Sequence, residues 1–165
     1  MRKLTVTLLG AFVLFGATSL AAQTATATVT VPMILSISLT GNSFDFGPTQ
    51  TDFDADSMAA GGTSVLSTRG NVPHEIDITA DAASFTFTQN TTYPYSDPSK
   101  PASDLHWSTG SGWTPLSTAA TPVVQNLARG AHATAATVSY YLMLSYANDV
   151  PGTYALNFTY TVVPN

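Results

Sequence analysis

The sequence predicts an all-β fold, an antiparallel β-sandwich, and three observations predict it. Several segments alternate apolar and polar residues with a period of two, which is the pattern of a half-buried strand. Turn signals built on Gly, Pro and Asn separate these segments at short intervals. No segment beyond the first 21 residues has the periodicity of an amphipathic helix. Many short strands between frequent turns are typical of a sandwich, and a closed barrel is the alternative.

The first 21 residues are expected to be a cleaved signal peptide. Met1-Arg2-Lys3 is basic, residues 4–20 are apolar, and Ser19-Leu20-Ala21 places small residues at the −3 and −1 positions of a cleavage site. The apolar run is short for a bilayer and no basic cluster follows it, so we expect no stable membrane insertion after cleavage. The mature protein is then secreted, either extracellular or periplasmic, and associated with the cell surface.

The remaining chain, residues 22–165, is expected to form a single domain made of strands. In the two cleanest alternating runs, Leu142, Leu144, Leu156 and Phe158 are the predicted core residues. Pro151-Gly152 suits the centre of a type II turn and would join those runs as a hairpin. The proline-containing stretch 91–103 is expected to be a surface loop. Strands are expected over residues 24–31, 34–39, 43–46, 63–68, 75–80, 84–88, 105–108, 113–117, 137–146 and 152–163.

Composition and charge exclude several classes of protein. Charged residues make up 9% of the chain, and 26 threonines and 16 serines supply most of the polarity. Without cysteine there is no disulfide, thiolate metal site or cysteine nucleophile. Loss of Arg2 and Lys3 with the signal leaves three basic against ten acidic residues, a net charge of −7. This charge argues against binding to nucleic acid and to anionic membranes.

The sequence carries no recognisable catalytic motif. It has no Gly-rich phosphate loop, no G-x-S-x-G and no H-E-x-x-H. The histidines, His74, His106 and His132, are scattered through expected loops and strand ends, whereas a zinc site needs three or four converging ligands. We therefore expect no enzyme activity, no cofactor, no catalytic metal and no covalent chemistry.

One acidic stretch is a weak calcium candidate. Asp52, Asp54 and Asp56 alternate, as the carboxylates at the start of an EF-hand loop do. Such a loop also needs Gly at its sixth position and Glu at its twelfth, and Ser57 and Thr63 stand there. The alternative is an acidic, solvated connection between strands.

Aromatic residues gather in another stretch and form a candidate ligand platform. One stretch of the sequence, residues 93–113, contains Tyr93, Tyr95, Trp107 and Trp113. Exposed aromatic rings can stack on the apolar faces of sugar rings. The alternative is that Trp107 and Trp113 pack in the core or in a hairpin.

Several motifs follow one another in a recognisable order along the chain. They are the Thr-rich start 25–31, Phe44-Asp45-Phe46-Gly47, residues 63–69 followed by 72–80, Leu105-His106-Trp107, and Pro151-Gly152-Thr153-Tyr154 followed by 159–162. Together they loosely resemble the secreted pilin-like domains of bacteria, which include spore coat protein U-like and chaperone–usher fimbrial subunits. The resemblance covers most of residues 24–163, although many of those subunits carry a disulfide that this chain cannot form.

The resemblance implies an incomplete Ig-like, Greek-key sandwich whose missing edge strand comes from a chaperone and then from a neighbouring subunit. The donor would be the start of the mature chain, inserting Ala25, Ala27, Val29 and Val31, with Pro32 as a hinge. The same segment could instead lie on its own sheet. The expected function is a structural fibre or coat subunit that binds itself or other surface subunits. The alternative is a secreted module that binds carbohydrate or another surface polymer.

Overall fold

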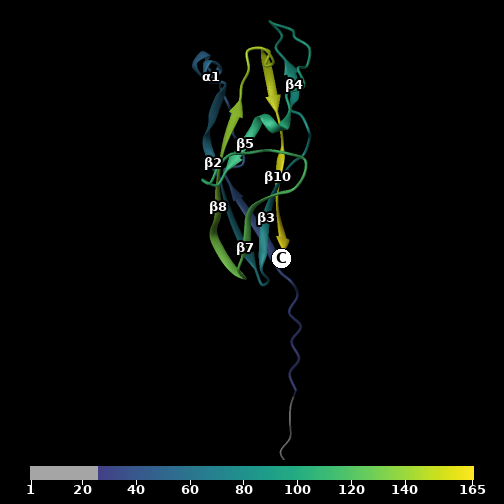
Figure 1. Cartoon of the computed structure of the whole chain (residues 1–165). Coiled ribbons are helices and arrows are strands. Elements are labelled where there is room, and N and C mark those ends of the chain that lie inside the picture. Colours follow the sequence, from purple (N-terminus) through teal and green to yellow (C-terminus); the bar gives the residue numbers. More distant parts are fainter. Residues whose placement is uncertain (1–25) are drawn as a thin grey trace, which may run out of the picture. The chain divides into compact units, whose positions relative to one another are not determined.

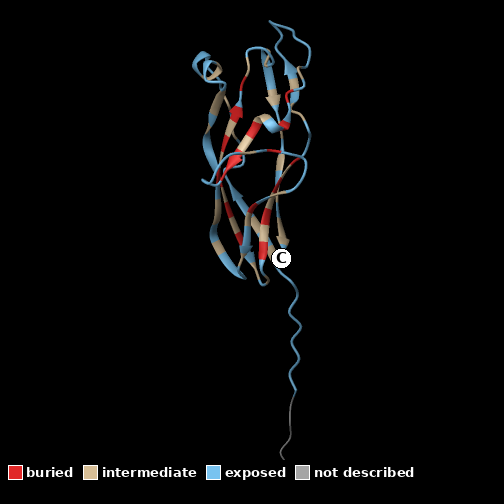
Figure 2. Ribbon diagram, in the orientation of Figure 1, coloured by how far each residue is buried: buried red, intermediate tan, exposed pale blue. Residues whose placement is uncertain are grey.

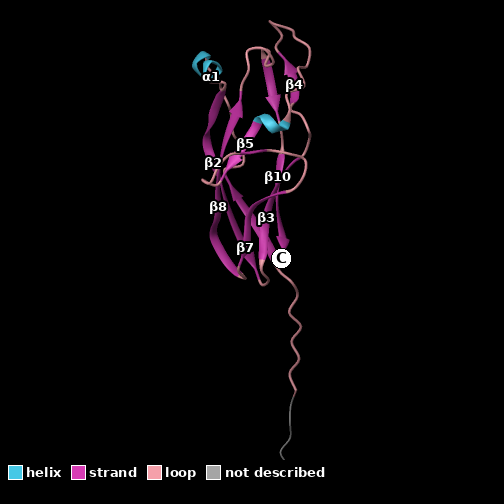
Figure 3. Ribbon diagram, viewed as in Figure 1, coloured by secondary structure: helices cyan, strands magenta, loops and turns pink. Residues whose placement is uncertain are grey.

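The computed structural model describes residues 26–165, so the expected signal peptide, 1–21, lies outside the described residues. The chain divides into two units, Met1–Val31 and Pro32–Asn165. The second unit is an all-β, antiparallel structure with one short α-helix and one 3-10 turn among its described residues (Figures 1 and 3). No helix within residues 26–165 is both long and apolar enough to span a bilayer.

The larger sheet has five strands in the order β1-β2-β8-β5-β6. Its two longest strands, β2 and β8, pair along most of their length, and Gly61 and Gly62 lie at a register shift inside β2. The strands of this sheet are β1 (Leu35–Thr40), β2 (Ser57–Gly70), β5 (Leu105–Ser108), β6 (Thr114–Pro115) and β8 (Gly130–Met143).

The smaller sheet has three strands in the order β10-β3-β7, and a separate two-stranded ribbon pairs β4 with β9. Alternation in β3 buries Ile76 and Ile78 completely, as expected from the sequence. These strands are β3 (His74–Ala80), β4 (Thr86–Gln89), β7 (Thr121–Leu127), β9 (Gly152–Ala155) and β10 (Phe158–Pro164). The remaining elements are α1 (Gln50–Asp54) and the 3-10 turn η1 (Ala102–Asp104).

The inner faces of the two sheets meet in one apolar core (Figure 2). Leu142 and Leu144 are buried, as predicted, whereas Leu156 and Phe158 are only half-buried at the margin of the core. The buried apolar residues are Leu66, Ile76, Ile78, Ala80, Ala102, Leu105, Trp107, Leu116, Val123, Val138, Tyr140, Leu142 and Leu144.

Within residues 32–165, three expectations for the strands and their connections are wrong. Residues 43–46 form no strand, and residues 152–163 form two strands, which pair with different partners. The Pro151-Gly152 hairpin is absent because β8 belongs to the five-stranded sheet while β9 pairs with β4. Gly152 also lacks the positive φ that a type II turn requires. The chain instead crosses between sheets after β8.

A chain of hydroxyl groups links the two sheets across the core. The Tyr160 hydroxyl on β10 donates to the Tyr140 hydroxyl on β8, Tyr140 donates to Ser64 Oγ at 2.7 Å, and Ser64 donates to the Gly41 carbonyl at 2.8 Å. Each buried hydroxyl therefore has a partner, which removes the cost of burying it. Burial raises the pKa of Tyr140, and burial together with the adjacent Tyr140 raises that of Tyr160.

Candidate functional site

The expected donor segment does not form the strand predicted for residues 24–31, at least over its described part. Residues 26–31 belong to no strand, and the side chains of Val29 and Val31 are 82% and 70% exposed. Ala27 is exposed as well, and Ala25 lies outside the described residues. Alternation alone predicted a strand here, but a strand also needs a neighbour to accept its backbone hydrogen bonds.

The folded unit begins sharply at Pro32, and the side chain of Asn71 holds it there. Asn71 Nδ2 donates to the Pro32 carbonyl at 2.7 Å, and the Ile34 amide donates to Asn71 Oδ1 at 2.8 Å. The Asn71 backbone amide also donates to the Ile34 carbonyl. Three hydrogen bonds on residues 32–34 fix where the domain starts, immediately after the exposed valines.

Two strand edges are open on one side of the sandwich. β1 is the end strand of the larger sheet and β10 is the end strand of the smaller one. These two strands approach each other without pairing. The inward residues of β10, Phe158, Tyr160 and Val162, are only half-buried, although the equivalent residues of β3 are fully covered. An end strand with a half-covered apolar face is a surface that another strand could complete.

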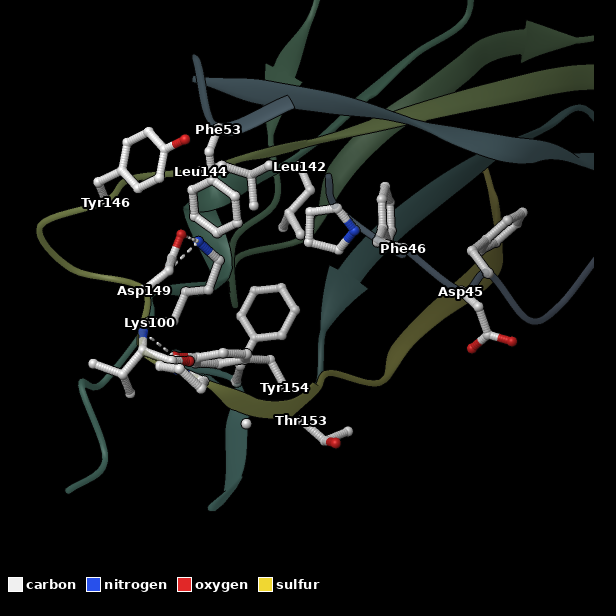
Figure 4. A pocket seen from close by; sticks show the side chains of 16 residues that line it. Asp45, Phe46, Phe53, Lys100, Leu142, Leu144, Tyr146, Asp149, Thr153 and Tyr154 are labelled. Atoms are coloured by element: carbon white, nitrogen blue, oxygen red, sulfur yellow. Dashed lines mark hydrogen bonds and ion pairs between the residues drawn. The ribbon is translucent and has the colours of Figure 1, made fainter. Parts of the chain in front are cut away.

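The described residues also enclose an open cavity of about 600 Å³. Its walls come from the segment that follows β1, from α1, from the end of β8 and from β9 (Figure 4). Aromatic and aliphatic side chains dominate these walls, so the cavity is suited to an apolar group. They are Phe44, Phe46, Phe53, Phe85, Leu142, Leu144, Tyr146, Val150 and Tyr154.

A buried ion pair lies in the wall of this cavity. Lys100 Nζ donates to both carboxylate oxygens of Asp149, at 2.9 and 3.0 Å, to Asp104 Oδ2 at 3.0 Å and to the Met143 carbonyl at 2.8 Å. The side chains of Lys100 and Asp149 are 3% and 7% exposed. Sequence reasoning missed this site. The available signal was that Lys100 is one of only three basic residues that follow Lys3 in the sequence.

The three aspartates of the calcium candidate do not converge. Asp52 accepts hydrogen bonds from the Thr49 amide and hydroxyl, which lower its pKa and cap α1. Asp54 accepts a hydrogen bond from the Tyr146 hydroxyl at 2.9 Å, and Asp56 ends the helix with a positive φ. Among residues 26–165, no three Asp, Glu or His side chains are grouped to hold a metal ion.

The predicted aromatic platform is wrong for Trp107, which is a core residue with 6% exposure. Tyr93, Tyr95 and Trp113 are exposed. Trp113 packs edge-on against Tyr141, with ring centroids 4.7 Å apart, and His106 stacks on Tyr141 at the same distance. An aromatic cluster therefore exists on β5, β8 and the segment before β6, but it comprises His106, Trp113 and Tyr141.

The histidines take structural roles. His74 is fully buried, and its Nδ1 faces the Val72 carbonyl at 3.0 Å while its Nε2 faces Thr68 Oγ1 at 2.9 Å. A carbonyl only accepts, so Nδ1 carries the proton in the neutral ring. His132 lies edge-on to His74 with centroids 5.7 Å apart and contacts the Ala128 carbonyl.

No protein-family model matches the sequence, and no curated protein shows significant similarity to it.

Proposed function

We propose that this protein is a secreted structural subunit of a surface fibre or coat, and that it associates by β-strand addition. The observation that carries the proposal is the open edge of β10 beside a half-covered apolar face, in a chain whose domain is preceded by an exposed, alternating segment. The basic, apolar and small-residue order of the N-terminus supports export.

The sheet order supports an Ig-like sandwich that lacks one strand. In a constant-type Ig domain, the first, second, fifth and fourth strands form one sheet, and the third, sixth and seventh form the other. Here β1-β2-β8-β5 follows the first order, and β3-β10 follows the start of the second. The seventh strand would lie along the outer edge of β10. No strand of the described residues occupies that edge.

The donor segment has the pattern that such an edge would select. Ala27, Val29 and Val31 alternate with threonines, so an extended conformation places all three on one face. Main-chain hydrogen bonds to β10 would supply affinity, and the apolar side chains would supply register. Burying each exposed valine contributes about 1.5–3 kcal/mol. The hydrogen bonds of Asn71 fix Pro32, so the segment is free to leave only up to Val31.

Deleting residues 22–31 is the direct test of this proposal. The exported full-length chain should form concentration-dependent polymers in size-exclusion chromatography with light scattering, whereas the truncated chain should remain monomeric. The truncated chain should also bind the free peptide 23–31, because its β10 edge stays open. A full-length chain that remains monomeric at high concentration, with truncation leaving its oligomeric state unchanged, would contradict strand addition.

A matched pair of substitutions distinguishes insertion of the segment's side chains into a neighbouring domain from non-specific association. Val29→Asp places a charge on the face that enters the sandwich and should abolish polymer formation. Thr28→Asp places the same charge on the opposite face and should leave most polymer formation intact. Equal loss in both variants would indicate that net charge, not side-chain insertion, controls association.

A second candidate function is binding of a neutral surface polysaccharide. The observation that favours it is the cluster of Trp113, Tyr141 and His106, in which Tyr141 and His106 are half-buried and Trp113 is 49% exposed. A monomeric protein retained on a polysaccharide column, with retention lost in Trp113→Ala, would support this function in place of the structural one.

A further inference from the structure

Lys100 and Asp149 meet in an arrangement that permits a covalent bond between them. Lys100 Nζ lies 2.9 and 3.0 Å from the two carboxylate oxygens of Asp149. Nearly equal distances place the nitrogen against the whole carboxyl group, so its carbon, Cγ, lies within the roughly 3–3.5 Å separation of a near-attack arrangement. We propose that Lys100 and Asp149 condense to an intramolecular amide that cross-links the domain.

Lys100 and Asp149 lie in the wall of an open cavity, but their side chains are themselves largely shielded from water, which favours loss of a water molecule over its addition. The two side chains are 3% and 7% exposed, and the apolar side chains of Phe53, Leu142 and Leu144 line the same cavity (Figure 4). Burying the Lys100 ammonium and the Asp149 carboxylate each costs desolvation free energy, and conversion of the two groups to a neutral amide removes both costs. The fold also holds the amine and the carboxyl group next to each other, so the condensation is an intramolecular step and needs no collision between molecules.

The groups around the pair match the steps of the condensation. The Lys100 ammonium first passes a proton to the Asp149 carboxylate, which leaves a neutral amine and a carboxylic acid. The amine then attacks Cγ and a C–N bond forms. The Ser145 amide donates to Asp149 Oδ2 at 2.9 Å, so it stabilises the charge that develops on that oxygen.

Asp104 is the proton carrier of the reaction. Its Oδ2 lies 3.0 Å from Lys100 Nζ, and its side chain is 30% exposed. It takes a proton from the attacking nitrogen and returns it to the leaving hydroxyl group, so that the C–O bond to Oδ1 breaks and water departs. The balance is one ammonium and one carboxylate giving one amide and one water. No redox change occurs, and Asp104 ends as a carboxylate.

The bond would tie the segment before η1 to the connection between β8 and β9. These segments are 49 residues apart in sequence and carry the chain between its sheets. A cross-link between them takes the place of a disulfide in a chain without cysteine. The inference does not rest on strand addition. It departs from the sequence-based expectation of no covalent chemistry, which considered cysteine and histidine only.

Mass spectrometry of the exported full chain tests the inference. The intact protein should be one water lighter than its sequence mass. Trypsin does not cut before proline, so Lys100 stays inside the peptide 70–129 and Asp149 lies in the peptide 130–165. Digestion in denaturant should therefore yield these two peptides joined as one branched species, and fragmentation should place the link at residues 100 and 149.

Two variants complete the test. Lys100→Arg keeps the positive charge but removes the amine, and should give the full sequence mass and two separate peptides. Asp104→Asn removes the proton carrier while keeping its size, and should slow cross-linking by about 10²–10⁴-fold, which would appear as unmodified protein after purification. Folded parent protein that keeps its full mass after incubation would overturn the inference. Loss of one water with the two peptides still separate would also overturn it, because that product is a local succinimide.

Discussion

Replacing Leu66 by alanine is expected to lower the free energy of unfolding by about 2–5 kcal/mol. Leu66 is completely buried on β2, an inner strand of the five-stranded sheet, between Leu39 of β1 and Ala136 of β8. Its side chain belongs to the core that both sheets share, so truncation leaves a cavity that rigid strands on either side cannot close. Urea denaturation followed by circular dichroism should show a lower midpoint with an unchanged slope.

Thr63→Ala is the matched control for Leu66→Ala. Thr63 lies on the same strand, pairs with Ser139 of β8 and is exposed. Removing its hydroxyl and methyl group should change the free energy of unfolding by no more than about 0.5 kcal/mol. Similar losses in both variants would mean that β2 does not present Leu66 to the core, and the assignment of its two faces would be wrong.

The sequence predicted the fold best where one side of a strand is covered and the other is solvated. In β3, alternate residues are buried without exception, because the strand lies in the middle of its sheet and only one of its faces meets the core. The all-β, antiparallel class and the burial of Leu142 and Leu144 follow from the same pattern. Alternation of apolar and polar residues with a period of two indicates a strand that is buried on one face, and this pattern can be found in the sequence alone.

Strand ends and pairings depend on neighbours that periodicity does not record. Residues 152–163 alternate without a break, yet the strand is interrupted where Asn157 accepts a hydrogen bond from the Asp81 amide and the chain changes partner from β4 to β3. The Ala-rich residues 131–136 have little intrinsic preference for a strand, and pairing with β2 incorporates them into β8.

The candidate sites were harder to predict because they join distant segments. Lys100 and Asp149 lie in two loops, and no spacing rule relates them. Trp107 looked like a possible ligand platform because it is aromatic and close in sequence to Trp113. In the structure the two side chains lie apart. Trp107 on β5 faces the core, whereas Trp113, which precedes β6, is exposed. The exposed residues 26–31 alternate as a strand does but pair with none of the described strands.

Above pH 10 the free energy of unfolding is expected to fall by about 1.4 kcal/mol per pH unit for each tyrosine that stays protonated in the folded state. Burial raises the pKa of Tyr140 above its ordinary value of 10.0, and burial with the neighbouring Tyr140 raises that of Tyr160 well above it. Below pH 10 both hydroxyls are protonated in the folded and unfolded chains, so they add no pH dependence. Above pH 10 the unfolded chain loses these protons first, which stabilises the unfolded state.

Burial also raises the pKa of Tyr154, so this residue adds to the loss of stability above pH 10. Substitutions of Tyr140 and Tyr160 separate their contribution from that of Tyr154. At pH 7, Tyr140→Phe should cost about 1–3 kcal/mol, since it leaves the Tyr160 hydroxyl without its partner. Tyr160→Phe should cost less, about 0.5–1.5 kcal/mol, because Tyr140 still donates to Ser64. Each variant should lose part of the alkaline slope in urea titrations between pH 9 and 11.5, and the double variant should lose the most. If the double variant keeps the slope of the parent protein, these tyrosines ionise as freely in the folded chain as in the unfolded chain, and the hydroxyl chain between the sheets is not shielded from water.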